Sequence, residues 1–156
     1  FLEVEVDTCT GIVRPIKAVM GGDAGTVVNP DMAHGQLEGG LSRGSGFALY
    51  ESNDWDKDGA LVSKGFWVDA KTPGITETPS LKDFTSFFAA SYEPTGPLGA
   101  KGLGEAATNP VAAAFANAIY NAIGIRFYEL PITPEKILKA LEEKEQAEGA
   151  AMGQER

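Results

Sequence analysis

Glu105 is the side chain in this sequence whose surroundings best suit acid–base chemistry. It closes a glycine-dense segment, residues 96–105, and stands a few residues before a predicted helix. Glycines allow a backbone to approach a ligand closely, and the start of a helix favours negative charge. The carboxylate can therefore act as a general base, or it can simply complement the helix dipole. The residue pattern alone leaves both alternatives open.

Three alternating aspartates, Asp54, Asp56 and Asp58, are followed by glycine and match the opening of an EF-hand calcium loop. Such a loop needs a bidentate glutamate at its twelfth position, and Gly65 stands there. We therefore predict a polar turn that leads into a strand over residues 61–69, and no calcium site.

The other groups that can ligate a metal or react stand alone in the sequence. His34 is the only histidine and Cys9 the only cysteine, so we expect a packing role for the first and an inert turn position for the second. Glu38 is predicted to be buried and hydrogen-bonded in a structural role rather than to be a second functional carboxylate. No metal ligand is predicted from this chain.

A hairpin and a glycine-rich helix are predicted ahead of the glycine-dense segment. Residues 2–20 have the pattern of a β-hairpin with a turn at 7–11, and Pro15 indicates an edge or a bulge in the second arm. Asp31 is the predicted cap of a helix over residues 32–50. The glycines within this helix imply that something packs very close to its backbone.

A second main helix is predicted over residues 110–123. Asn109 is its predicted cap, Pro110 its first residue and Gly124 its end. Apolar residues recur at every fourth position along it and form a stripe that can pack on a core.

These elements predict an α+β fold, with a β-hairpin or small mixed sheet packed by the helices over 32–50 and 110–123. A third helix is predicted to begin at Thr133–Pro134. Residues 1–145 are expected to form one domain, within the usual range of about 100–200 residues. Residues 146–156 are expected to be a flexible tail.

The composition limits the possible partners. A net charge of −9 and a pI near 4.6 make nucleic acid and anionic membranes poor partners. No apolar run approaches the ~20 residues that span a bilayer, and no signal-peptide pattern is present. A single cysteine suits the reducing cytoplasm. Because the sequence begins without Met in a strand-like run, we expect a piece of a longer chain.

Four segments, in register, resemble the C-terminal part of the large subunit in the xanthine dehydrogenase/aldehyde oxidase family of molybdenum hydroxylases. They are Gly-Asp-Ala-Gly-Thr-Val-Val-Asn-Pro at 22–30, Gly-Gln-Leu-Glu-Gly-Gly at 35–40, Gly-Ala-Lys-Gly-Leu-Gly-Glu at 99–105 and Leu-Pro-Ile-Thr-Pro-Glu-Lys-Ile at 130–137. The last three match the family's glutamine-bearing helix, its catalytic loop and its closing motif.

The resemblance implies a hydroxylation in which oxygen from water is added to an electron-poor carbon of a purine-like N-heterocycle or of an aldehyde. Glu105 would be the catalytic base that accepts the proton. Gln36 would hydrogen-bond a molybdenum–molybdopterin cofactor, and the backbone of Leu103 and Gly104 would line it. Whether this cofactor carries a dinucleotide stays open.

The same resemblance implies partners. Iron–sulfur clusters and FAD are expected on other domains or subunits, and the other cofactor loops on the remaining segment of the large subunit. The isolated chain is therefore expected to be inactive. The alternative is a non-catalytic structural or assembly domain of such a complex.

Two departures from the family pattern leave the substrate open. Ala106 and Ala107 stand where proline often follows the glutamate, and Ser-Arg-Gly-Ser-Gly at residues 42–46 replaces the commoner Gln-Gly-x-Gly.

Overall fold

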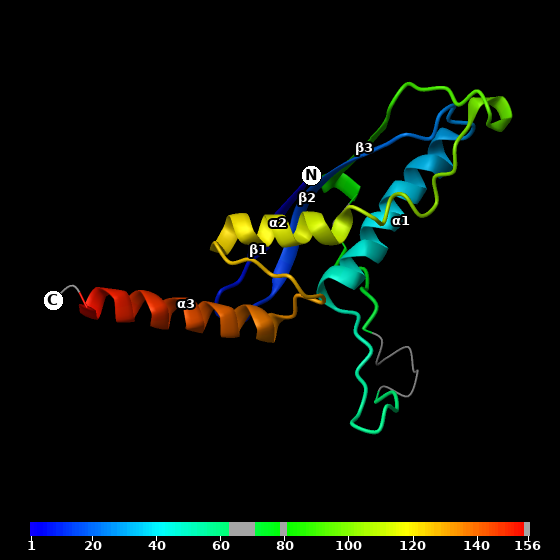
Figure 1. Ribbon diagram of the computed structural model, residues 1–156. Helices are drawn as coiled ribbons and strands as arrows, with labels where there is room; N and C mark the ends of the chain where they lie inside the picture. Colours follow the sequence, from blue (N-terminus) through cyan, green and yellow to red (C-terminus); the bar gives the residue numbers. More distant parts are fainter. Residues whose placement is uncertain (63–70, 79–80, 155–156) are drawn as a thin grey trace.

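The computed structural model describes residues 1–62, 71–78 and 81–154 of the 156-residue chain. The elements follow in the order β1 (Leu2–Val6), β2 (Val13–Gly22), α1 (Pro30–Leu49), η1 (Leu81–Asp83), β3 (Phe84–Phe88), η2 (Pro97–Gly99), α2 (Val111–Ile123) and α3 (Pro134–Gln154) (Figure 1). This combination of a small sheet and helices confirms the predicted α+β class.

The sheet has the strand order β1-β2-β3, with an antiparallel hairpin at one side and a parallel pair at the other. Within the hairpin, Glu3 pairs with Lys17 but Val4 pairs with Pro15, so Ile16 is an extra residue in the ladder. Proline has no amide hydrogen to donate, which explains why the ladder breaks at this point. The predicted hairpin is confirmed. Of the edge and the bulge that Pro15 indicated, the bulge is present, whereas β2 is the central strand and not an edge.

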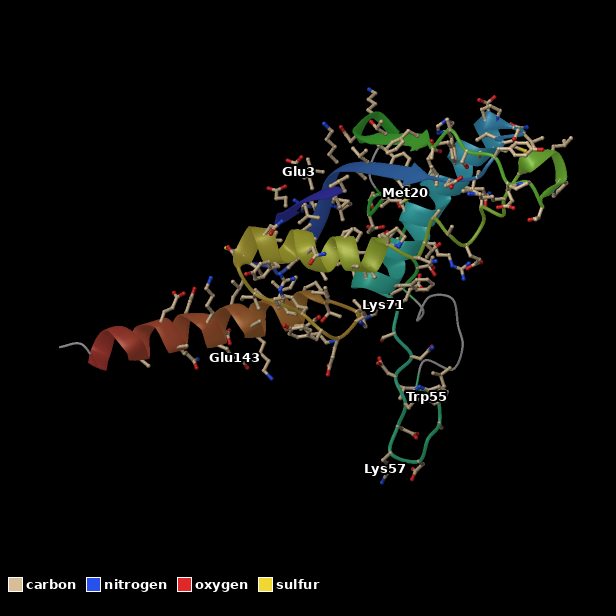
Figure 2. The ribbon with its side chains drawn as sticks, turned by 45° about the horizontal axis from the view of Figure 1, so that its top comes forward. Glu3, Met20, Trp55, Lys57, Lys71 and Glu143 are labelled. Atoms are coloured by element: carbon tan, nitrogen blue, oxygen red, sulfur yellow. The ribbon has the colours of Figure 1, made fainter. Side chains whose placement is uncertain are left out.

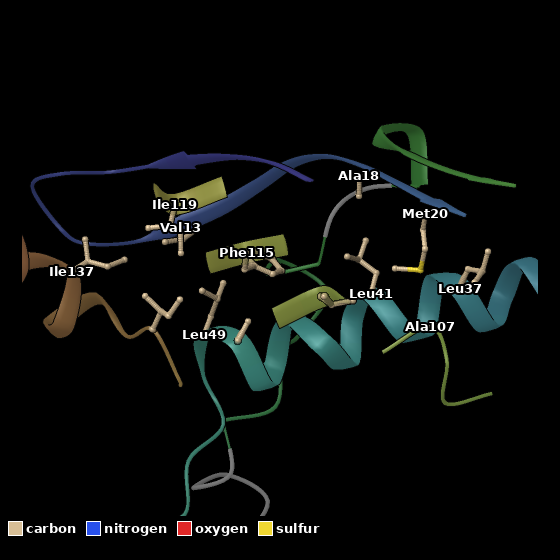
Figure 3. Packing of buried hydrophobic residues seen from close by; sticks show 13 residues of the cluster. Val13, Ala18, Met20, Leu37, Leu41, Leu49, Ala107, Phe115, Ile119 and Ile137 are labelled. Atoms are coloured by element: carbon tan, nitrogen blue, oxygen red, sulfur yellow. The ribbon is translucent and has the colours of Figure 1, made fainter. Parts of the chain in front are cut away.

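Helices α1 and α2 cover one face of the sheet, and the hydrophobic core lies between these helices and the strands (Figures 1 and 3). Figure 3 shows side chains of β2 facing those of α1 and α2, with Ile137 of α3 closing one end. Phe115 and Ile119 of α2 are fully buried, so the predicted apolar stripe of this helix is confirmed. The buried members of the core are Val13, Ala18, Met20, Leu37, Leu41, Ala48, Leu49, Ala107, Val111, Phe115, Ile119, Ile132 and Ile137.

Helix α1 begins earlier than predicted, and its cap is a different residue. Asn29 has extended backbone angles, and its side-chain oxygen accepts the Met32 amide hydrogen at 3.1 Å. Pro30 is the first helical residue, where its missing amide hydrogen costs nothing. Asp31, the predicted cap, lies inside the first turn and complements the positive end of the helix dipole.

Helix α2 begins at Val111, and the prediction of Asn109 as its cap is wrong. Pro110 occupies the cap position with helical angles and makes no side-chain capping hydrogen bond. The preceding residues already form turns, in which the Thr108 amide donates to the Glu105 carbonyl at 3.1 Å. The predicted end is confirmed, because Gly124 adopts the left-handed conformation with φ 72°.

Helix α3 begins as predicted, with the Thr133 hydroxyl accepting the Lys136 amide hydrogen at 3.4 Å. It continues to Gln154, through most of the predicted tail, and projects beyond the rest of the domain (Figure 1). Residues 142–150 are exposed, as an acidic, solvated helix requires. The domain boundary at residue 145 stays a prediction. Throughout the described ranges, every helix is too short or too polar to cross a bilayer.

The aspartate-rich segment forms a turn, as predicted. Oδ1 of Asp56 accepts the amide hydrogens of Asp58 and Ala60 at 2.9 and 2.8 Å. Figure 2 shows Trp55 and Lys57 on this loop, well away from the helices. The predicted strand over residues 61–69 lies mostly outside the described residues.

Candidate functional site

A cavity of about 210 Å³ brings together three of the four site residues predicted from the sequence, Gln36, Gly104 and Glu105. One wall comes from α1 and the other from the turns that precede α2. The side chain of Leu103, the fourth residue, instead packs against the hydrophobic core. The cavity is lined by Gly35, Gln36, Gly39, Gly40, Arg43, Gly104, Glu105 and Thr108.

Two glycines of α1 allow the close packing that the sequence implied. A β-carbon on Gly40 would lie 2.8 Å from the carbonyl carbon of Ala107 and collide with its side chain. A β-carbon on Gly44 would collide with Val111. These two glycines therefore let the start of α2 and its preceding turn lie directly on the α1 backbone.

Gly35 and Gly39 have no such neighbour. A β-carbon on either would meet no atom of the described chain within 4 Å. Each weakens the helix by roughly 0.5–1 kcal/mol relative to alanine, so the packing of this chain gives no reason for them. Both line the cavity beside Gln36, where they leave bare backbone on its wall.

The segment that leads to Glu105 is docked against the end of β2. The Thr26 amide donates to the Gly99 carbonyl, and the Lys101 amide donates to the Ala24 carbonyl, each at 2.9 Å. Gly25 has φ 61°, and a β-carbon there would collide with the Gly99 carbonyl oxygen. Only glycine fits this contact, because both its left-handed conformation and its lack of a side chain are required.

Leu98 shows strain within the same segment. It adopts the left-handed conformation, φ 56° and ψ 17°, which costs a residue with a β-carbon roughly 1–2 kcal/mol. The residue is 77% exposed. The tight turn that it forms with Gly99 presents the Gly99 carbonyl to β2.

A salt bridge stabilises the contact between the segment that leads to Glu105 and the end of β2. Nζ of Lys101 lies 2.7 Å from a carboxylate oxygen of Asp23, whose other oxygen accepts hydrogen bonds from Ser91 and the Gly25 amide. The pKa of Asp23 is held well below its usual range, first by the Lys101 hydrogen bond and then by those of Ser91 and Gly25. This ion pair was not predicted from the sequence, although the Asp-x-Gly spacing at residues 23–25 is typical of a turn closed by an aspartate side chain.

The Glu105 carboxylate is exposed at the edge of the cavity. Thr108 and Arg43 line the same cavity, so residues that carry a carboxylate, a hydroxyl and a cation border one space. This arrangement can hold a small polar molecule beside a carboxylate that is accessible for proton transfer.

The remaining candidate residues have structural surroundings. Nδ1 of His34 lies 2.5 Å from the Ser86 hydroxyl and its ring meets Phe88 edge-on, which confirms the packing role. Glu38 is only half-buried and has no hydrogen-bond partner among the described residues, so its predicted buried role is wrong. Cys9 is exposed in the hairpin turn.

Larger cavities lie elsewhere and contain none of the predicted site residues. One of about 500 Å³ borders Tyr50 and Pro134, and an apolar one of about 320 Å³ borders Met20 and Val111. The pKa of Tyr50 is raised by burial and, to a lesser extent, by the neighbouring charge of Glu77. In the described parts of the chain, no three His, Cys, Asp or Glu side chains gather as a metal site would require.

Several known proteins are similar to this chain in sequence and in fold. The sequence model of the molybdopterin cofactor-binding domain matches residues 1–79. The probable hypoxanthine oxidase XdhD of Escherichia coli K12 is 39% identical over 142 residues, 91% of this chain and 14% of that protein. The nicotine 6-hydroxylase large subunit of Paenarthrobacter nicotinovorans is 35% identical over 146 residues, 89% of this chain and 17% of that protein.

A solved structure has a similar fold over most of this chain. The aldehyde oxidoreductase from Desulfovibrio gigas superposes with a TM-score of 0.78 and 35% identity, over 89% of this chain and 15% of that one. The chain thus spans less than a fifth of the length of each protein compared. The matched family region includes Gln36 and ends before Glu105.

Proposed function

Since the chain belongs to the molybdopterin cofactor-binding family of molybdenum hydroxylase large subunits, we propose that it forms one wall of such an enzyme's active site, with Glu105 as the base. The observation that carries this proposal is the cavity in which Gln36, Gly104 and Glu105 meet. Residues 1–145 are the proposed cofactor-binding domain.

The cavity wall suits a flat, polar cofactor such as a pterin. Gly35 and Gly39 expose helix backbone that no described residue covers. The Gln36 side-chain oxygen lies 3.8 Å from the position of a β-carbon on Gly104, so the amide of Gln36 lies close to the Gly104 backbone where both line the cavity. An amide offers both a donor and an acceptor, which matches the mixed hydrogen-bonding edge of a pterin ring.

The bound molybdenum–pterin group would supply the redox chemistry of the hydroxylation. Gln36 would orient the pterin by hydrogen bonds, and the backbone of Leu103 and Gly104 would line it. Glu105 would accept the proton lost by the attacking water oxygen at its carboxylate. The substrate carbon would belong to an N-heterocycle or an aldehyde, and a neighbouring domain would bury the carboxylate and exclude water.

The short span of this chain relative to its relatives supports further partners. One relative is named as the large subunit of its enzyme, so such relatives work in assemblies of several subunits. We propose that the rest of a large subunit completes the cofactor site and that iron–sulfur and FAD domains or subunits carry electrons away. The chain alone should accordingly lack turnover.

Glu105→Gln in the assembled enzyme tests the proposal, because glutamine keeps the shape of the side chain but cannot accept the proton. Turnover should fall by roughly 10²–10⁴-fold while molybdenum content and assembly stay near those of the parent. Glu38→Gln is the matched control on α1 and should leave turnover within a few-fold. A fully loaded Glu105→Gln enzyme with near-parental turnover would favour the non-catalytic, structural alternative.

A further inference from the structure

Arg43 is a charged residue on the wall of the Glu105 cavity that the proposed function leaves without a role. On α1 it stands seven residues after Gln36 and four after Gly39, so the three share one helix face. Seven residues rise by about 10.5 Å along a helix. Two long polar side chains therefore flank a bare patch of backbone at Gly39.

The guanidinium of Arg43 has no acidic partner in the described chain. The ion pairs among the described residues are Lys101–Asp23 and Lys139–Glu143, and Arg43 is in neither. Its guanidinium carbon lies 5.5 Å from the centre of the Phe47 ring, one turn further along α1. Such a contact orients the group through its flat face and leaves its N–H donors available at the edge.

We propose that Arg43 binds an oxyanion, a carboxylate or a phosphate, of the molecule that lies along the Gln36–Gly39–Arg43 face. The planar guanidinium can donate two parallel hydrogen bonds to either group. Two sources share this chemistry: the phosphate of the pterin cofactor and a carboxylate on the substrate. The inference rests on the proposed function, since it assumes that this cavity receives the cofactor or the substrate.

Glu105 lines the same cavity, and its negative charge would determine which end of an anionic molecule faces Arg43. Two negative groups in one small space repel each other, whereas an oxyanion beside Arg43 is attracted. An anionic molecule would therefore place its charged end at Arg43 and its neutral end toward Glu105. The Thr108 hydroxyl, on the same cavity, can donate a further hydrogen bond.

The test compares Arg43→Gln and Arg43→Lys in the assembled, cofactor-loaded complex, with Lys139→Gln as the matched loss of one positive charge on a distant, exposed helix face. Equilibrium dialysis measures the binding of labelled benzoate, a planar carboxylate, and of benzamide, its neutral counterpart. Elemental analysis measures the molybdenum retained after gel filtration. Neither measurement requires turnover.

A substrate-carboxylate role predicts that Arg43→Gln weakens benzoate binding by about tenfold or more and leaves benzamide unchanged. A cofactor-phosphate role predicts instead a several-fold lower molybdenum content. Arg43→Lys keeps the positive charge but cannot donate two parallel hydrogen bonds. In both cases its benzoate affinity or molybdenum content should therefore lie between those of the parent and of Arg43→Gln. Lys139→Gln should match the parent.

Unchanged benzoate binding together with unchanged molybdenum content in Arg43→Gln would overturn the inference. An equal loss of benzoate and benzamide binding at full molybdenum content would overturn it too, since it would indicate packing rather than charge recognition. The outcome is separable from the base role of Glu105: a Glu105→Gln complex that keeps its turnover rejects the proposed base, while these binding measurements still decide the role of Arg43.

Discussion

The ammonium group of Lys101 lies 2.7 Å from the carboxylate of Asp23, 78 residues earlier in the chain. This contact joins the end of β2 to the segment that carries Glu105. The position of the candidate base therefore depends on a salt bridge and on the backbone hydrogen bonds beside it, and not on α2 alone.

Asp23→Asn should lower the stability of the chain at neutral pH and have less effect in acid. The pKa of Asp23 is depressed in the folded state, mainly by Lys101. A carboxyl group whose pKa is lower in the folded state stabilises the fold at pH values above its unfolded pKa of about 3.9. This contribution is lost as the pH falls toward the folded-state pKa. Urea unfolding from pH 7 to pH 3 should show the difference between parent and variant shrinking below pH 5.

Glu143→Gln is the control for this titration, because the Lys139–Glu143 pair is 3.9 Å long and both side chains are mostly exposed. Such pairs contribute little to stability. A difference between parent and Asp23→Asn that stays constant with pH would contradict the assignment.

Gly25→Ala should destabilise the chain more than Gly59→Ala. Both glycines have positive φ, so alanine costs each position roughly 1–2 kcal/mol. Only at Gly25 would the new side chain also collide with backbone, at the Gly99 carbonyl, whereas Gly59 has open space. Free energies of unfolding from urea titrations measure both, and equal losses would argue against the docking of the Glu105 segment on β2.

Gly39→Ala and Gly40→Ala are neighbouring changes with opposite expected effects. Gly39→Ala should stabilise the chain by about 0.5–1 kcal/mol, because alanine favours a helix and meets nothing here. Gly40→Ala should destabilise it, typically by about 1–3 kcal/mol for overpacking, through its collision with Ala107. Thermal unfolding of both variants gives the comparison.

The same Gly39→Ala variant should bind less cofactor once it is part of the assembled complex, because the added methyl group occupies the open face. Molybdenum analysis measures this. A more stable variant with full cofactor loading would show that nothing approaches Gly39 closely.

Asn29→Ala should cost about 1 kcal/mol of stability, the usual loss for a helix cap. Asn109→Ala should cost close to nothing, although Asn109 is also followed by proline and a helix. Asn29 accepts the Met32 amide hydrogen, whereas α2 begins without a side-chain cap. Urea unfolding compares the two, and a loss in Asn109→Ala as large as in Asn29→Ala would restore Asn109 as a cap.

These two asparagines show what local sequence can predict here. Each stands in an Asn-Pro pair, and a helix was correctly predicted after both, from Asp31 as the cap in the first case and from Asn109 in the second. Asn29 has the extended angles, φ −132° and ψ 101°, that let a side chain turn back to the helix. Before α2, the turns from Glu105 onward leave Pro110 with helical angles, φ −83° and ψ −10°. That difference comes from tertiary docking, which local pattern does not contain.

The candidate site was predictable to a similar extent. Motif resemblance selected Gln36, Gly104 and Glu105, and the fold brings them to one cavity. Periodicity found the buried stripe of α2 because burial repeats every turn. The Asp23–Lys101 pair and the unequal surroundings of the α1 glycines depend on contacts between distant segments, so no local window contains them.

The parallel ladder between β2 and β3 also sets a limit on how fast the chain can fold. Ala18 pairs with Phe84, so the intervening chain, α1 included, must be gathered before this ladder can form. Pairings between distant residues are slow because the entropy of closing the loop is lost before the contacts are gained. The hairpin and α2 involve only nearby residues and can form first, whereas the Glu105 segment docks on the finished end of β2. The candidate site should therefore be among the last parts to acquire amide protection during refolding.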